Sequence, residues 1–126
     1  MSLNYVMLGS NDVQAARAFY DAVFPAIGGQ IVAEYMPHAF CYELVGGGRV
    51  WVATPFDEGV ATAGNGAMVG LACDSREMVD EAHRVGLVKG GTDEGAPGPR
   101  PQYGPDFYGG YLRDLDGNKL SFVWFG

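Results

Sequence analysis

The spacing of apolar residues along the first half of the chain predicts a strand, a helix and three further strands. Residues 4–8 form a short apolar run that is typical of a strand. In residues 13–24 the apolar positions recur at three- and four-residue steps, which predicts an amphipathic helix capped by Asn11 or Asp12. The proline and glycines of residues 25–29 end this helix. The further strands are predicted at residues 30–35, 40–45 and 49–54.

The second half of the chain repeats this order. Residues 67–73 are typical of a strand, Ser75 can cap the next helix, and apolar spacing continues that helix through residues 78–87. Residues 95–105 contain four prolines, and so many prolines predict a long loop rather than an interior strand. The last two strands are predicted at residues 107–113 and 119–125.

The final strand has a clear two-residue alternation, which assigns its side chains to two faces of a sheet. The first face takes Leu120, Phe122 and Trp124, and the second takes Ser121, Val123 and Phe125. The Asp-Gly-Asn turn before this strand supplies a side-chain acceptor and a glycine free to adopt positive φ.

Composition limits the chain to one compact domain. Its 126 residues are 48% hydrophobic, which suits a single core of ordinary size. The 20 glycines and seven prolines favour short strands and turns over a helical bundle. No apolar run is long enough to span a membrane and no secretory leader is evident, so we expect a cytoplasmic protein with no membrane partner.

Charge and cysteine content narrow the possible partners. Fifteen acidic and eight basic residues give a net charge of −7, which argues against nucleic-acid binding because that requires a basic surface. The same charge favours a cationic ligand or serves solubility alone. Cys41 and Cys73 lie in apolar runs, and we interpret them as buried thiols, although a disulfide is formally possible.

Three motifs in order carry a resemblance to a known family. They are Ser-Asn-Asp-Val-Gln-Ala-Ala-Arg-Ala-Phe-Tyr at residues 10–20, Arg-Pro-Gln-Tyr-Gly-Pro-Asp-Phe-Tyr at residues 100–108, and Asp-Gly-Asn-Lys at residues 116–119. Together they resemble the vicinal-oxygen-chelate superfamily of glyoxalase, bleomycin-resistance and extradiol-dioxygenase proteins. The resemblance covers nearly the whole chain.

The resemblance implies an α+β fold of two βαβββ modules. Module one would take about residues 1–60 and module two about residues 65–126, within one glyoxalase-like domain. The modules would form curled, mainly antiparallel sheets with helices on their convex faces. The resemblance also implies a homodimer, and an apolar final strand left exposed at the C-terminus would favour the same assembly.

The resemblance also implies four metal-ligand positions, but this chain has unsuitable residues there. The matching positions are Tyr5, Trp51, Met68 and Ser121. A catalytic divalent ion prefers carboxylate oxygen or imidazole nitrogen, so we predict no metal cofactor. His38 and His83 form no ligand pair in the sequence, and both are predicted to lie at the surface.

The substitutions would instead make an aromatic, methionine-containing cup. Alternation would bring Met7 beside Tyr5, and Val123 and Phe125 beside Ser121. The rim would be formed by Arg100, Tyr103, Tyr108 and Tyr111. Such a cup suits a small aromatic or cationic organic molecule, whereas the alternative is that these side chains only fill a core. A glyoxalase I-like lyase or dioxygenase-type enzyme is the alternative function, with no catalytic residue assigned.

Overall fold

The computed structural model describes residues 2–126, which form two successive groups of strands around one helix each. The first group contains β1 (Tyr5–Gly9), α1 (Val13–Ala26), β2 (Gln30–Tyr35), β3 (Ala39–Glu43) and β4 (Arg49–Ala53). The second contains β5 (Val69–Ala72), α2 (Arg76–Val88), β6 (Thr92–Pro99), a 3₁₀ turn (Pro101–Tyr103), β7 (Tyr108–Arg113) and β8 (Lys119–Trp124). Each group is a βαβββ module, which confirms the predicted α+β fold class.

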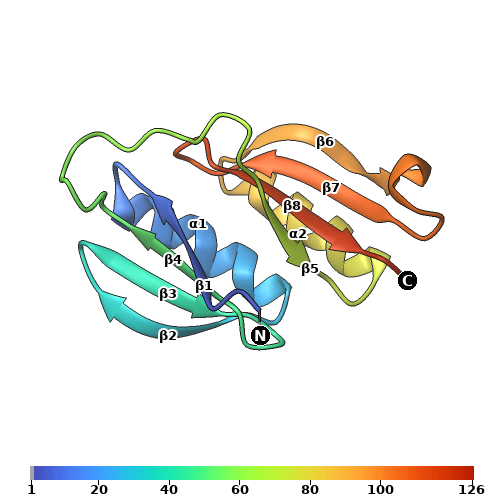
Figure 1. Ribbon diagram of the computed structural model, residues 1–126, viewed down its shortest axis with the longest axis horizontal. Helices are drawn as coiled ribbons and strands as arrows, with labels where there is room; N and C mark the ends of the chain where they lie inside the picture. Colours follow the sequence, from blue (N-terminus) through green and yellow to red (C-terminus); the bar gives the residue numbers. More distant parts are fainter. Residues whose placement is uncertain (1) are drawn as a thin grey trace.

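Each module forms its own four-stranded sheet. The strand orders are β1-β4-β3-β2 and β5-β8-β7-β6. The first and last strands of each module pair in parallel, and the other neighbours are antiparallel. Figure 1 shows the sheets side by side with both helices behind them, and the connection from β4 to β5 arching over the top. We call the sheet face opposite the helix the open face of each module.

Side-chain caps begin both helices as the sequence predicts. The Asp12 carboxylate accepts a hydrogen bond from the Ala15 backbone N–H at 3.0 Å, so Asp12 is the cap of α1. Ser75 caps α2 in the same way, accepting from the Met78 backbone N–H at 3.1 Å. α1 ends directly before Ile27, and Gly28 follows with a φ of +81°, a left-handed conformation that glycine adopts at little cost.

The proline-rich segment differs from its prediction, because residues 95–99 belong to strand β6 and are not a loop. β6 is an edge strand that pairs only with β7, and its register shifts on both sides of Gly95. Pro97 and Pro99 are tolerated because a residue on an edge strand can lack an N–H donor without breaking an interior ladder. The segment is therefore not an interior strand, as predicted. The predicted loop is too long, because residues 95–99 are the end of an edge strand.

The C-terminal strand is not left exposed, whereas the argument for a dimer assumes that it is. β8 lies between β5 and β7, with Leu120 and Phe122 buried against the helix layer. Only Phe125, beyond the end of β8, is a large exposed apolar side chain in this region. The exposed-strand argument for a dimer is therefore wrong, because pairing on both edges shields β8 within the chain.

The turn before β8 links the two modules. Buried Asp114 accepts a hydrogen bond from the Tyr20 hydroxyl of α1 at 2.6 Å. Asn118 donates to the Gly9 carbonyl at 3.0 Å, and Asp116 accepts from the Asn11 backbone N–H at 2.9 Å. The helices also pack against each other. The Asp-Gly-Asn turn is therefore a clamp between modules as well as a connection between strands.

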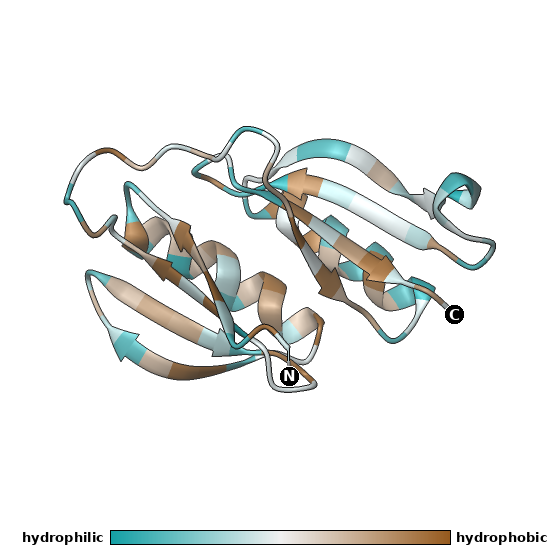
Figure 2. Ribbon diagram, in the orientation of Figure 1, coloured by the Kyte–Doolittle hydropathy of each residue, from teal (hydrophilic) through white to brown (hydrophobic). Residues whose placement is uncertain are grey.

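Hydrophobic residues are concentrated on the central strands of the molecule. Figure 2 shows them along β1, β4, β5 and β8, whereas edge strand β6 is mostly polar or neutral. No helix within residues 2–126 is long and apolar enough to cross a membrane. Both cysteines are free thiols, with Cys41 buried and Cys73 half-buried, and burial raises the pKa of Cys73 to about 11.

Candidate functional site

Strand register gives module two an open face with small and aromatic side chains. Ser121 of β8 lies between Gly70 of β5 and Tyr111 of β7, and Val123 lies between Ala72 and Gly109. A cavity of about 270 Å³ opens on this face, and we call it the module-two pocket. Its lining comprises Met68, Gly70, Leu71, Ala72, Phe107, Tyr111, Ser121, Val123 and Phe125.

The pocket combines one small hydroxyl with an aromatic wall. Ser121 is 2% exposed, and its Oγ would lie 3.3 Å from a Cβ placed on Gly70, so the absence of a side chain at Gly70 leaves the pocket open. Phe107 meets Phe125 edge-on with ring centroids 5.1 Å apart. Tyr103 meets Phe107 in the same manner at 5.2 Å. The site can therefore hold an apolar or aromatic group beside the buried Ser121 hydroxyl.

The open face of module one is separate from this pocket. Tyr5 and Met7 are 55% and 57% exposed, and Met7 lies opposite Trp51 in the parallel pairing of β1 with β4. The Trp51 ring stacks on Tyr35 at 6.1 Å between centroids. Tyr5 lines a smaller hollow of about 110 Å³ that shares Gly70 and Leu71 with the module-two pocket. Tyr5 is thus a neighbour of the pocket, but it is not part of its lining.

The structure therefore brings together only part of the predicted site. Met68, Ser121 and Val123 line one pocket, whereas Tyr5, Met7 and Trp51 lie on module one. Phe125, which alternation places with Ser121, also lines this pocket, whereas three further lining residues were outside the prediction, namely Leu71, Ala72 and Phe107. Alternation along the predicted strand at residues 107–113 could have found Phe107, because Phe107 lies two steps of two residues before Tyr111.

The predicted rim residues take three different positions. Arg100 lies over the Tyr111 ring, with its guanidinium carbon 5.7 Å from the ring centroid. Tyr103 reaches the pocket wall through Phe107. Tyr108 instead donates a hydrogen bond to Asp80 of α2 at 2.6 Å, so it lies toward the helix and does not join the pocket.

The four positions implied as metal ligands do not fit a divalent ion. A tryptophan N–H can only donate, a methionine thioether suits soft ions, and a neutral serine hydroxyl is a weak ligand. The tyrosine would be the sole oxygen donor of phenolic type, on a different module from Met68 and Ser121. No group of three or more His, Cys, Asp or Glu side chains within residues 2–126 could hold a metal ion.

The histidines have different environments. His38 is exposed, as predicted, but the surface prediction for His83 is wrong because this side chain is 5% exposed. Its Nε2 lies 3.1 Å from both a carboxylate oxygen of Asp93 and the carbonyl oxygen of Tyr111. Because both neighbours are acceptors, Nε2 carries the proton. His83 thereby ties α2 to β6 and β7 and has a structural role.

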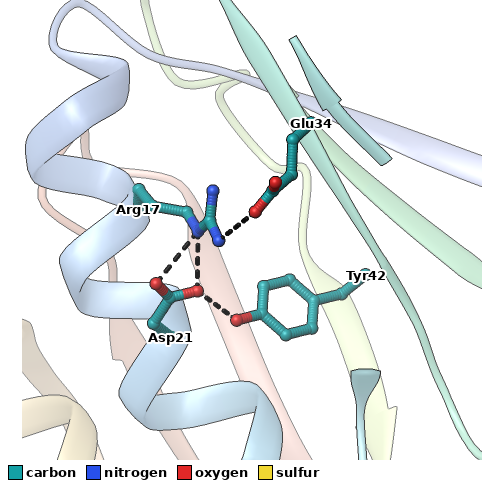
Figure 3. Close-up of polar contacts among 4 residues, drawn as sticks. All are labelled: Arg17, Asp21, Glu34 and Tyr42. Carbon is teal, nitrogen blue, oxygen red and sulfur yellow. Dashed lines mark hydrogen bonds and ion pairs between the residues drawn. The ribbon is translucent and has the colours of Figure 1, made fainter. Parts of the chain in front are cut away.

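A second polar cluster connects α1 to β2 and β3 of module one. Figure 3 shows Arg17 between Asp21 and Glu34, with the Tyr42 hydroxyl pointing at Asp21. The Arg17 side chain is within 2.8 Å of Asp21 and 2.5 Å of Glu34. Burial and the hydrogen bond to Asp21 raise the pKa of Tyr42. Each of the four side chains is paired with another member of the cluster, which indicates a structural tie.

Comparison with known proteins identifies the family of the chain. The family model of the Glyoxalase/Bleomycin resistance protein/Dioxygenase superfamily matches residues 2–122. The chain belongs to this superfamily. A glyoxalase/bleomycin resistance protein from Albidiferax ferrireducens T118 is 36% identical to this superfamily member, covers 96% of each chain and has a TM-score of 0.84.

More distant solved structures support the fold of this superfamily member alone. A glyoxalase-related enzyme from Fulvimarina pelagi is 20% identical with a TM-score of 0.76, covering 98% of this chain and 87% of its own. A lactoylglutathione lyase from Agrobacterium tumefaciens is 21% identical with a TM-score of 0.69, covering 97% and 92%. A comparison with proteins of curated function returned no match.

Proposed function

We propose that this protein binds a small aromatic organic molecule in the module-two pocket. The observation that carries the proposal is the lining of the pocket, where a methionine and aromatic rings surround one buried hydroxyl at Ser121. Apolar area of this kind supplies binding free energy, and one polar group orients the ligand. The glycine at position 70 keeps the entrance free of a side chain.

The proposed binding does not use a metal ion. Support comes from the residue types at the four family ligand positions, which are Tyr5, Trp51, Met68 and Ser121. Enzymes of the lyase and dioxygenase type in this fold use a metal to polarise substrate oxygens or to bind dioxygen, and these side chains do not offer the ligands for it. Binding without catalysis is therefore the function that the residue types support best.

Titration with a neutral aromatic probe tests the binding site. We expect β-naphthamide to bind the wild-type protein and raise its melting temperature. Gly70→Val should abolish this effect, because a branched side chain in β5 fills the pocket entrance while suiting a strand. Gly48→Val is the matched control, since a Cβ there meets nothing within 4 Å. Equal binding by both variants would place the probe elsewhere and overturn the proposal.

Metal analysis tests the second part of the proposal. We expect purified protein to contain no stoichiometric metal and β-naphthamide binding to be unchanged by EDTA. One Ni, Zn, Fe or Mn ion per chain, together with EDTA-sensitive binding, would contradict the metal-free proposal. That result would favour the lyase or dioxygenase alternative, which assays with glutathione hemithioacetals and catechols would then separate.

We also propose that two copies associate through their open faces. Four large apolar side chains on or beside these faces are at least half exposed, and such a surface is costly in water. They are Tyr5, Met7, Met68 and Phe125. Sedimentation should give a dimer for the wild-type protein and a monomer for Met7→Glu. Val88→Glu, an equally charged change at an exposed site on α2, should stay dimeric, and a monomeric wild type would refute the assembly.

A cytoplasmic setting is part of the same proposal. Two unpaired thiols, one of them fully buried, suit a reducing compartment. Fractionation of the native host should recover the protein with cytoplasmic markers, and recovery in an exported fraction would contradict this location.

A further inference from the structure

Two basic side chains flank the aromatic ring at one wall of the module-two pocket. The Arg100 guanidinium carbon lies 5.7 Å from the Tyr111 ring centroid, and the Lys119 Nζ lies 5.8 Å from it. Tyr111 itself lines the pocket, and its partner in the antiparallel ladder is Ser121. Lys119 stands two residues before Ser121, so alternation places both on the open face. Positive charge is therefore gathered beside the pocket of an acidic protein.

These two cations are not neutralised by neighbouring carboxylates. Half of the eight Lys and Arg residues form ion pairs, namely Arg17, Arg49, Arg84 and Arg113. Within residues 2–126, neither Arg100 nor Lys119 has a carboxylate at ion-pair distance. Arg113, the ladder partner of Lys119, is already paired with Glu94. Unpaired positive charge thus remains on the Tyr111 side of the pocket.

The Arg100 side chain is held in place by backbone groups. Its guanidinium donates to the Ala96 carbonyl at 2.8 Å and to the Pro99 carbonyl at 3.2 Å. A Cβ on Gly98 would lie 3.1 Å from Nη1, and one on Gly95 would lie 3.6 Å from Nη2, so these glycines leave room for the guanidinium. Carbonyl groups fix the orientation but leave the charge uncompensated. A preorganised cation of this kind suits an anionic group of a ligand.

From these contacts we propose that the ligand is a small aromatic carboxylate, with its ring in the module-two pocket and its carboxylate beside Arg100 and Lys119. This inference rests on the proposed function and names the chemistry of its ligand. It reverses the expectation of a cation from the net charge of −7, because short-range contacts decide recognition where distant surface charges are screened. A purely structural role of the two cations on Tyr111 would give no preference for an anion.

Three probes of nearly equal shape and different charge test the proposal. They are β-naphthoate, β-naphthamide and β-naphthamidine, which are negative, neutral and positive at neutral pH. At low salt we expect β-naphthoate to bind about three- to ten-fold more tightly than β-naphthamide. The factor is modest because water screens charge contacts that are half exposed. β-Naphthamidine should bind most weakly, and added salt should reduce the differences.

Charge-removing variants locate the source of this preference. Arg100→Gln and Lys119→Gln should each reduce the ratio of naphthoate to naphthamide affinity, with little change in naphthamide affinity. Lys89→Gln removes the same charge from the exposed end of α2 and should leave the ratio unchanged. An unchanged ratio in both pocket variants, or an equal fall in Lys89→Gln, would overturn the proposal.

The outcomes separate this inference from the function on which it rests. If β-naphthamide binds in a Gly70-dependent way but β-naphthoate binds no better, the carboxylate inference fails and the aromatic pocket stands. If none of the three probes binds, the proposed function fails and the inference fails with it. Tighter binding of β-naphthamidine would restore the cationic ligand expected from net charge.

Discussion

The two modules share an order of elements but fill their helix-facing layers with different side chains. Module one packs aromatic rings together, with Tyr20 stacked on Phe24 at 4.9 Å and Phe24 tilted against Tyr42 at 4.8 Å between centroids. Module two buries the Phe122 ring in this layer beside aliphatic residues and glycine, with Tyr108 and Trp124 partly buried. A Cβ on Gly86 of α2 would lie only 2.5 Å from Leu112 Cδ2, so α2 lies close to β7. The stacked rings of module one and the close approach at Gly86 in module two therefore give the two helix-facing layers different packing.

The open faces differ as much as the cores. On module one, Glu43 and Arg49 are ladder partners and form an ion pair at 3.6 Å. On module two, Arg100 and Lys119 flank Tyr111 beside a pocket. Under the proposed function, module one contributes an aromatic core and module two carries recognition. Repeated topology thus leaves the chemistry of each copy free to diverge.

The largest expected effect comes from opening the aromatic core of module one. Phe40→Ala should lower the free energy of unfolding by about 3–5 kcal/mol, because this fully buried ring leaves a cavity. The loss should appear at both modules, since the Tyr20–Asp114 bond and the helix packing join them. In a Trp124→Phe background the fluorescence of Trp51 follows the denaturation of module one. In a Trp51→Phe background the fluorescence of Trp124 follows module two. A shifted Trp51 transition with an unchanged Trp124 transition would show that the modules unfold independently.

A smaller effect is expected when the link between modules is cut. Tyr20→Phe should cost about 1.5–3 kcal/mol, because it removes a 2.6 Å hydrogen bond to the buried carboxylate of Asp114. Urea denaturation measures the change, with Tyr5→Phe as a control at an exposed phenol. Equal stability of the two variants would contradict a stabilising clamp between the modules.

High pH should weaken module one through its buried phenols. Burial raises the pKa of Tyr20, with help from the Asp114 charge, and burial with the Asp21 hydrogen bond raises that of Tyr42. The folded state therefore favours the protonated phenols, and their contribution is full below about pH 10 and is lost as pH rises toward the folded values. Urea midpoints above that pH should fall less steeply in Tyr42→Phe. Tyr103→Phe should retain the wild-type slope, and a similar flattening there would refute the assignment.

Low pH should act on module two, and this effect is the smallest. The Gly95 backbone N–H, followed by His83, lowers the pKa of Asp93. Its carboxylate therefore contributes stability above its unfolded pKa of about 4, and that contribution is lost as pH falls through the lower folded value. Asp93→Asn should make melting temperatures less sensitive to acid. Asp106→Asn is an exposed control, and identical acid profiles for wild type and Asp93→Asn would contradict the role.

Local sequence signals located much of the fold and part of the candidate site. Alternation correctly put Ser121 and Val123 on one face of β8, because side-chain direction in a strand is a local property. The same rule extends to Lys119 and Phe125. The buried side of α2 was also encoded, since Val79, Ala82, His83 and Gly86 follow helical spacing. His83 was predicted at the surface because charged Glu81 and Arg84 lie next to it in the sequence, but helical spacing places it on the buried side of α2.

Other predictions failed where long-range pairing overrides composition. The prolines of β6 indicated a loop, yet β7 supplies a partner for an edge strand that tolerates them. The exposed-strand argument failed because β8 has β5 and β7 on its two sides. The rim prediction for Arg100 could not include its orientation, which depends on carbonyl groups of β6 and on the Tyr111 ring.

The sequence by itself determined the caps and the two-residue and helical periods, because these depend on residue identity and near neighbours. The tertiary structure alone decided which faces meet. It placed Met68, Ser121 and Val123 around one pocket, left Tyr5, Met7 and Trp51 on another sheet, and set two cations beside Tyr111. Such groupings arise from strand order and helix packing between distant segments, which no local period specifies.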